Sequence, residues 1–132
     1  GMGMYAVCSE VVGGNRIGRT LDFPTINQQF GEKQLVPKRG VYSTVTLIDN
    51  KTYNSITNIG VKPTVEKDIK PLAETHILDF SGNLYGKEIE VRFNKFIRDE
   101  KKFSSLDELK IQIKKDIEYV RQQSEMSELH RL

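Results

Sequence analysis

The chain has 132 residues, a mass of 15.1 kDa and a formal net charge of +2, which fits a single domain of ordinary size. Its hydrophobic content of 37% and mean hydropathy of -0.48 exclude a wholly disordered chain, a collagen-like repeat and a small disulfide scaffold. The balance of 20 basic and 18 acidic residues argues against a nucleic-acid-binding protein, which usually carries a strongly basic face.

The lack of a visible targeting signal and the single cysteine predict a cytoplasmic protein. No stretch approaches the roughly 20 apolar residues that span a bilayer, and no secretory signal is visible. The single Cys8 cannot form an internal disulfide or a cysteine metal site. We therefore expect one cytoplasmic domain over residues 1–132, with a cloning remnant at Gly1, a disordered start at residues 1–4 and a tail at residues 124–132.

Short runs rich in β-branched and aromatic residues, separated by Gly and Pro, predict strands over most of the chain. The expected strands are residues 5–12, 41–48, 53–59, 73–80 and 88–96. Turn residues at 49–51 and 81–83 predict two hairpins. The segments 13–39, 61–72 and 97–104 show little periodicity and are expected to be irregular.

A change of period after Ser105 predicts a helix over residues 106–123. Its apolar residues recur at spacings of three and four: Leu106, Leu109, Ile113, Ile117 and Val120. Ser105 and Glu108 fit a capping box at its start. The sum is an all-β protein, most simply a closed barrel without exposed edges, with one helix packed outside.

The sequence lacks the motifs of several classes of enzyme. The chain has no P-loop and no protein-kinase motif set. Its two histidines, His76 and His130, are too few and too far apart for a zinc cluster.

Residues 14–27, which read GNRIGRTLDFPTIN, are candidates for anion and metal binding. The backbone between Gly14 and Gly18 could approach a phosphate closely, with Arg19 supplying charge, although a plain glycine loop explains the same letters. Pro24 favours an extended shape, which points Thr25 and Asn27 to one side. Their oxygens suit Mg²⁺ together with phosphates, although on spacing alone the capping of a turn is the plainer interpretation.

Glu74 at the start of a predicted strand could act as a general base. A solvent-facing strand residue is the plainer interpretation. His76 shares a face with Glu74 if the strand is regular, and a structural hydrogen-bonding role suits it better than catalysis.

Three strings together resemble the riboflavin kinase domain, which is the C-terminal half of bacterial bifunctional riboflavin kinase/FAD synthetases. They are GNRIGRTLDFPTIN, ETHILDFSGNLYGKEIEV and FIRDEKKFSSLDELKIQIKKDIE, in matching order and spacing. The resemblance implies a six-stranded antiparallel Greek-key barrel with an outer helix. It also implies ATP-dependent phosphorylation of riboflavin to FMN, with Mg²⁺ accompanying ATP.

The resemblance also implies roles for individual residues. The expected base is Glu74, and Thr25 and Asn27 match the residues that bind Mg²⁺ and phosphate. The remaining positions expected at ATP are Gly14, Arg19, Ile77, Asp79 and Tyr85. Those expected on a flap that encloses the flavin are Arg98, Lys101 and Phe103.

Two positions depart from the family's pattern. Asp22 stands where the family usually has glycine and adds negative charge near the expected phosphate site. Ile26 replaces the usual alanine, and packing should tolerate it if it points away from Thr25 and Asn27.

Other functions remain open at this point. If Asp22 has spoiled the nucleotide site, the chain could be a non-catalytic flavin- or FMN-binding module. A single-stranded nucleic-acid barrel needs exposed aromatics among basic residues, which the sequence does not suggest. An FMN adenylyltransferase domain outside this chain is a candidate partner.

Overall fold

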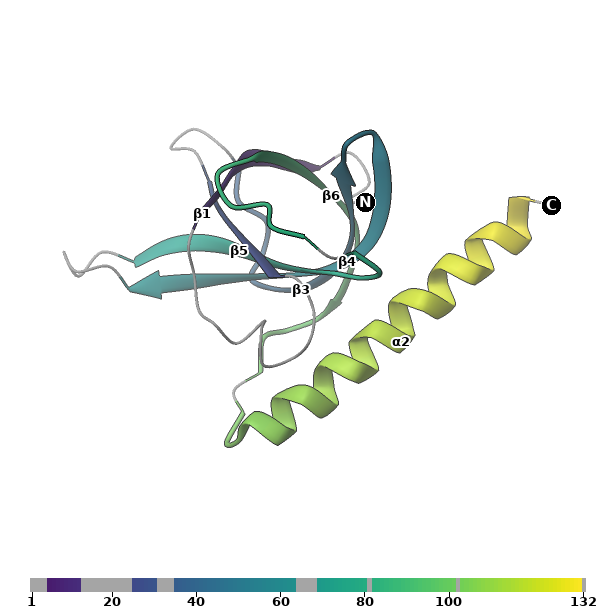
Figure 1. Ribbon diagram of the computed structural model, residues 1–132. Helices are drawn as coiled ribbons and strands as arrows, with labels where there is room; N and C mark the ends of the chain where they lie inside the picture. Colours follow the sequence, from purple (N-terminus) through teal and green to yellow (C-terminus); the bar gives the residue numbers. More distant parts are fainter. Residues whose placement is uncertain are drawn as a thin grey trace.

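The computed structural model describes residues 5–12, 25–30, 35–63, 69–80, 82–101 and 103–131. These residues form six strands and one long helix (Figure 1). The strands are β1 (Ala6–Val12), β2 (Thr25–Gln29), β3 (Gly40–Ile48), β4 (Lys51–Pro63), β5 (Ile69–Ile77) and β6 (Glu88–Arg98). The helix is α2 (Leu106–Arg131).

The strands close into a barrel in the order β1-β2-β5-β4-β3-β6, and every neighbouring pair is antiparallel. Closure leaves these strands no unpaired edge. The predicted all-β barrel with one outer helix is therefore confirmed.

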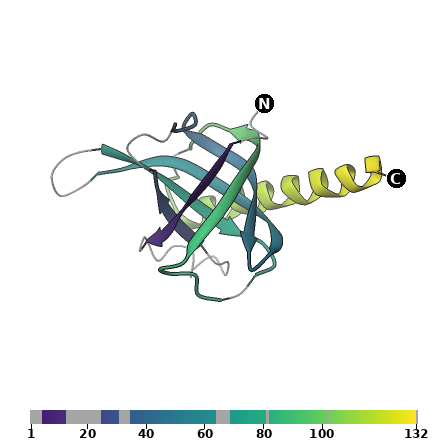
Figure 2. The same ribbon diagram turned by 90° about the horizontal axis from the view of Figure 1, so that it is seen from above.

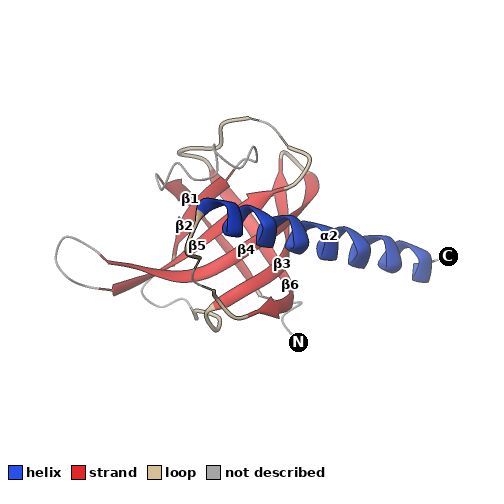
Figure 3. Cartoon of the chain, turned by 90° about the horizontal axis from the view of Figure 1, so that it is seen from below, coloured by secondary structure: helices blue, strands red, loops and turns tan. Residues whose placement is uncertain are grey.

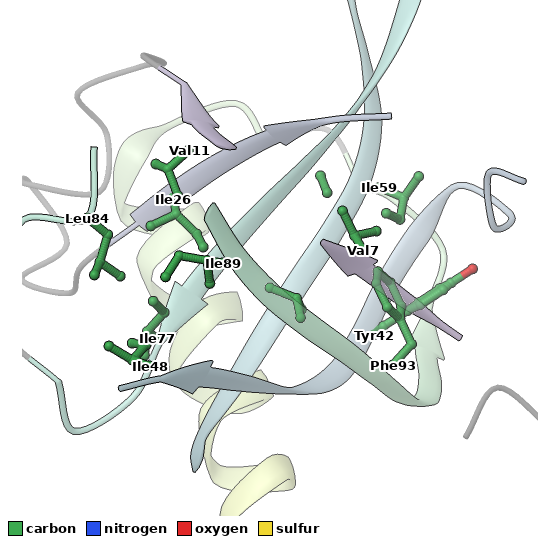
Figure 4. Close-up of a cluster of buried hydrophobic side chains, with 12 residues drawn as sticks. Val7, Val11, Ile26, Tyr42, Ile48, Ile59, Ile77, Leu84, Ile89 and Phe93 are labelled. Atoms are coloured by element: carbon green, nitrogen blue, oxygen red, sulfur yellow. The ribbon is translucent and has the colours of Figure 1, made fainter. Parts of the chain in front are cut away.

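Alternation along each strand separates a barrel interior from an outer face. In β6, Ile89, Val91 and Phe93 are at most 5% exposed, as their alternation with charged residues predicts. Figure 4 shows the apolar interior, to which all six strands contribute. Part of the interior is polar, because buried hydroxyls of Thr44, Ser55, Thr57 and Thr75 bond one another across β3, β4 and β5.

One of the two predicted hairpins is confirmed and the other is wrong. Asp49 and Asn50 have φ of 49° and 67° and join β3 to β4 in a two-residue turn. The strands on either side of residues 81–83 do not pair: β5 lies between β2 and β4, whereas β6 lies between β3 and β1. The connection spans residues 78–87 and is held to β1 through Val11, whose amide bonds the Lys87 carbonyl at 2.9 Å.

Parts of the segments expected to be irregular are strands. Strand β2 lies inside the segment 13–39, and β4 and β5 extend along each other to the register pair Pro63 and Ile69. Strand β6 continues to Arg98, while β5 ends at Ile77, three residues before its predicted end. These changes lengthen the sheet without altering its predicted class.

Helix α2 lies on the outside of the barrel, and its C-terminal end extends beyond it (Figures 2 and 3). Its Val120 packs with Val41, Ile56 and Leu78 on the outer face. At its start the Glu108 amide donates to Ser105 Oγ at 3.2 Å, as the capping box predicts, although the Glu108 carboxylate accepts from the Ser104 amide. The helix continues through most of the predicted tail, and it lacks the apolar length needed to cross a membrane.

Candidate active site

The outer face of β2, β5 and β4 brings three oxygen-bearing side chains into one row. Asn27 on β2 is the register partner of Glu74 on β5, and Asn58 on β4 is the partner of Glu74 on its other side. Side chains directly opposite each other on antiparallel strands have Cβ atoms about 4.5–5.5 Å apart. The non-local pairing of β2 with β5 thus places Asn27 beside Glu74, although 46 residues separate them in sequence.

A second pair lies beside this row, where Thr25 is the register partner of His76. Thr25 Oγ1 and His76 Nδ1 share a hydrogen bond of 2.9 Å, and His76 Nε2 lies 3.9 Å from Glu74 Oε1. Burial lowers the pKa of His76 to about 4, against a smaller raising effect of the Asp116 charge. The imidazole is therefore neutral at physiological pH and fixes Thr25 through a hydrogen bond.

The lowered pKa of His76 predicts a stability loss in acid. Between about pH 6.5 and 4 the unfolded state binds more protons at this residue, so the free energy of unfolding falls with pH. The loss is roughly 3 kcal/mol. Glu74, whose pKa is raised by burial, acts in the opposite sense in acid. We therefore expect the free energy of unfolding of His76→Gln, measured with urea, to fall much less between pH 6.5 and 4 than that of the wild type. The same pH dependence in both proteins would contradict this.

Glu74 has the environment of a base. Its side chain is 28% exposed, and burial raises its pKa because desolvation disfavours the carboxylate. A carboxylate with a raised pKa holds an abstracted proton better than an ordinary surface glutamate.

Asn27 supplies an oxygen suited to a hard cation. Its Oδ1 is buried and has no hydrogen-bond partner in the described part of the chain. Those same residues contain no group of three or more His, Cys, Asp or Glu that could hold a metal. The amide oxygen of Asn27 and the hydroxyl of Thr25 are uncharged, so they fit Mg²⁺ only when a ligand such as a polyphosphate supplies the negative charge.

A cavity of about 210 Å³ opens beside Glu74, between the outer face of the barrel, residues 98, 100, 101 and 103, and the first turns of α2. Its apolar lining comes from Val41, Ile56, Phe103, Leu109 and Ile113. Its polar lining comes from Asn58, Glu74, His76, Arg98, Glu100, Lys101 and Asp116. The predicted flavin residues Arg98, Lys101 and Phe103 therefore share one cavity with the predicted base.

A buried ion pair closes one side of this cavity. Arg98 Nη2 and Nε donate to the two carboxylate oxygens of Asp116 at 2.9 and 3.2 Å, and the Asp116 side chain is 5% exposed. Gln112 donates to the same carboxylate at 3.1 Å and accepts from Lys101 at 3.3 Å. The network joins β6 and residue 101 to α2.

The other predicted site residues lie away from the cavity or outside the described residues. Ile77 points into the barrel interior at 0% exposure, so only its backbone could contact a nucleotide. Asp79 forms a bidentate ion pair with Arg121 at 3.0 Å, and Tyr85 is exposed on the 78–87 connection. Gly14, Arg19 and the unusual Asp22 lie outside the described residues.

Ile26 is buried in the barrel core, away from Thr25 and Asn27, as packing at this position requires (Figure 4). Sequence reasoning missed Asn58 and Asp116. Asn58 had a usable signal, because asparagine is depleted in strands and this one alternates with Thr57 and Ile59 inside a predicted strand. For Asp116 the sequence gives no such signal beyond its place in a predicted helix.

Comparison with known proteins gives a consistent family. A family model described as "Flavokinase: Riboflavin kinase" matches residues 2–124. The bifunctional riboflavin kinase/FMN adenylyltransferase of Haemophilus influenzae is 43% identical over 115 residues, covering 86% of this chain and 37% of that protein. The Escherichia coli K12 protein of the same name is 42% identical over 113 residues, covering 85% and 36%.

A solved structure titled "Crystal Structure of Macrolide-efflux Protein from Streptococcus pneumoniae" superposes with a TM-score of 0.79 at 33% identity. The match covers 88% of this chain and 38% of that one. The chain thus spans little more than a third of the length of these relatives.

Proposed function

Because this chain belongs to the riboflavin kinase family, we propose that it transfers the terminal phosphoryl group of ATP to the ribityl 5′-hydroxyl of riboflavin, giving FMN and ADP. The observation that carries the proposal is the pairing of Asn27 with Glu74, which lines a partly apolar cavity. Such a cavity with a few convergent polar groups is typical of a small-molecule site.

Glu74 accepts the proton of the 5′-hydroxyl as the oxygen attacks phosphorus. An alcohol is a weak nucleophile until a positioned base takes its proton, and burial raises the pKa of Glu74 toward the range where it can do so. The neutral His76 at 3.9 Å adds no fixed charge that would weaken this base.

In this proposal Asn27 Oδ1 and Thr25 Oγ1 would hold Mg²⁺, and the glycine-containing segment from Gly14 to Arg19 would hold the polyphosphate. When bound, Mg²⁺ neutralises charge on the transferring phosphoryl group. His76 keeps the Thr25 side chain in place through its 2.9 Å hydrogen bond. The buried amide oxygen of Asn27, without a partner in the described residues, supports this assignment.

The isoalloxazine ring lies in the apolar part of the cavity, against Val41, Ile56 and Phe103. Arg98 and Lys101 border the same space and provide donors for polar edges of the ring. Burying the ring here excludes water from the reacting hydroxyl, which limits hydrolysis of ATP.

Removing the Asn27 amide tests the metal assignment. Asn27→Ala is expected to raise the Mg²⁺ concentration needed for half-maximal activity by roughly tenfold. This is about the effect of losing one polar contact to a charged group. Gln29→Ala, on the same strand and the same outer face but exposed, is the matched control. An unchanged metal titration for Asn27→Ala would remove Asn27 from the site.

The activity itself is tested by incubating the chain with riboflavin and Mg·ATP and separating the flavins by chromatography. ATP-dependent FMN without FAD is the expected result, since the names of the relatives include an adenylyltransferase activity that we assign to a domain beyond these residues. Flavin binding without FMN formation would instead identify a non-catalytic flavin-binding module.

A further inference from the structure

The residues of the site follow one another around the barrel in a fixed order. Register pairs join Asn27 on β2 to Glu74 on β5, Glu74 to Asn58 on β4, Asn58 to Val41 on β3, and Val41 to Arg98 on β6. Adjacent strands lie about 4.8 Å apart, so this row crosses the outer face in even steps. Asn58 is therefore the residue between the proposed base and the apolar wall of the cavity.

Asn58 carries an unexplained polar atom. Its Oδ1 is buried, lacks a hydrogen-bond partner in the described residues, and belongs to a side chain that lines the cavity. A buried acceptor left unpaired costs about 1–3 kcal/mol, and native proteins rarely retain one without reason. The Asn58 side chain lies on the cavity side of β4, because it alternates with Thr57 and Ile59 of the interior.

We propose that Asn58 binds a hydroxyl of the ribityl chain and makes the site selective for flavins that carry a polyhydroxyl chain. This inference rests on the proposed function, because it places the 5′-hydroxyl at Glu74 and the ring against Val41 and Phe103. The chain between them must then cross Asn58, over a distance of about 10 Å or two strand spacings. A carboxamide both accepts and donates, so it suits an alcohol, which does the same.

Selectivity follows from the cost of leaving the amide unpaired. A site built to hydrogen-bond a hydroxyl discriminates against an analogue that lacks it, because its buried polar groups then have no partner. Lumiflavin has the ring of riboflavin with a methyl group in place of the ribityl chain, so it tests this point directly.

The experiment measures binding of riboflavin and lumiflavin by quenching of flavin fluorescence, with Mg·ADP present so that no turnover occurs. Asn58→Ala is expected to bind riboflavin about tenfold more weakly, the effect of one hydrogen bond, and to bind lumiflavin as the wild type does. Asn58→Leu, which keeps the volume of the side chain, should give the same result and guards against collapse of the cavity. Asn54→Ala, on the same strand and face but outside the cavity lining, is the matched control.

An equal loss for both flavins would assign Asn58 to the shape of the cavity and overturn the proposal. Unchanged riboflavin affinity would overturn it as well, while FMN formation by the wild type would leave the proposed function standing. A wild type that binds neither flavin and forms no FMN would remove the proposed function, and the role of Asn58 with it.

Discussion

Replacing Glu74 with glutamine is expected to lower kcat for FMN formation by roughly a hundredfold or more while riboflavin still binds. Glutamine preserves the size of the side chain and its place opposite Asn27 but cannot accept the proton of the 5′-hydroxyl. The loss should appear in kcat with little change in KM, because the proton is transferred only in the transition state.

Glu118→Gln is the control for this substitution, since it removes an exposed carboxylate on α2 that does not line the cavity. The comparison uses initial rates of FMN formation and a riboflavin titration with Mg·ADP. Turnover of Glu74→Gln near that of the wild type would mean that another group takes the proton.

Replacing Asp116 with alanine is expected to destabilise the protein by about 3 kcal/mol, because the largely buried Arg98 guanidinium then has no carboxylate to pair with. The Asp116 side chain is 5% exposed and that of Arg98 17%, so water compensates poorly for the lost partner. Gln112 also loses its acceptor. Thermal unfolding should show a Tm lower by about 10 °C for a chain of this length.

Arg121→Ala provides a control, since Arg121 on α2 and Asp79 in the connection after β5 form a bidentate pair that is far more exposed than the pair of Arg98 and Asp116. The side chains of Arg121 and Asp79 are 48% and 67% exposed, and such pairs contribute at most about 1 kcal/mol. Similar Tm losses for Asp116→Ala and Arg121→Ala would contradict the importance of burial.

Local patterns predicted the fold class because most strands are either regularly alternating or bounded by turn residues. Strand β2 escaped prediction because its inward positions are Ile26 and Gln28, and a buried glutamine breaks the apolar period. The Nε2 of Gln28 donates to the carbonyls of Ser9 and Ile89, whereas its Oε1, in the barrel interior and away from the cavity, has no partner in the described residues. The wrong hairpin at residues 81–83 has another cause, since turn chemistry is local whereas strand order depends on closure of the whole barrel.

The same division applies to the site. The two-residue spacing of Thr25 with Asn27, and of Glu74 with His76, predicted that each pair shares a face, and the structure confirms this. That the two pairs lie side by side could not be derived from spacing, because this depends on which strands pair and in what register. Asp116 was beyond prediction for the same reason, since its partner Arg98 comes from a different element.

The alternation of β5 gives the protein two independent sets of positions on one strand. Ala73, Thr75 and Ile77 belong to the interior, while Glu74 and His76 belong to the cavity. Ligand preference can therefore diverge at even-numbered positions of this strand without repacking the hydrophobic centre. Insertion of a single residue at its start would exchange the two sets, driving the carboxylate inward and the apolar side chains into solvent, so sequence drift here is confined to substitution.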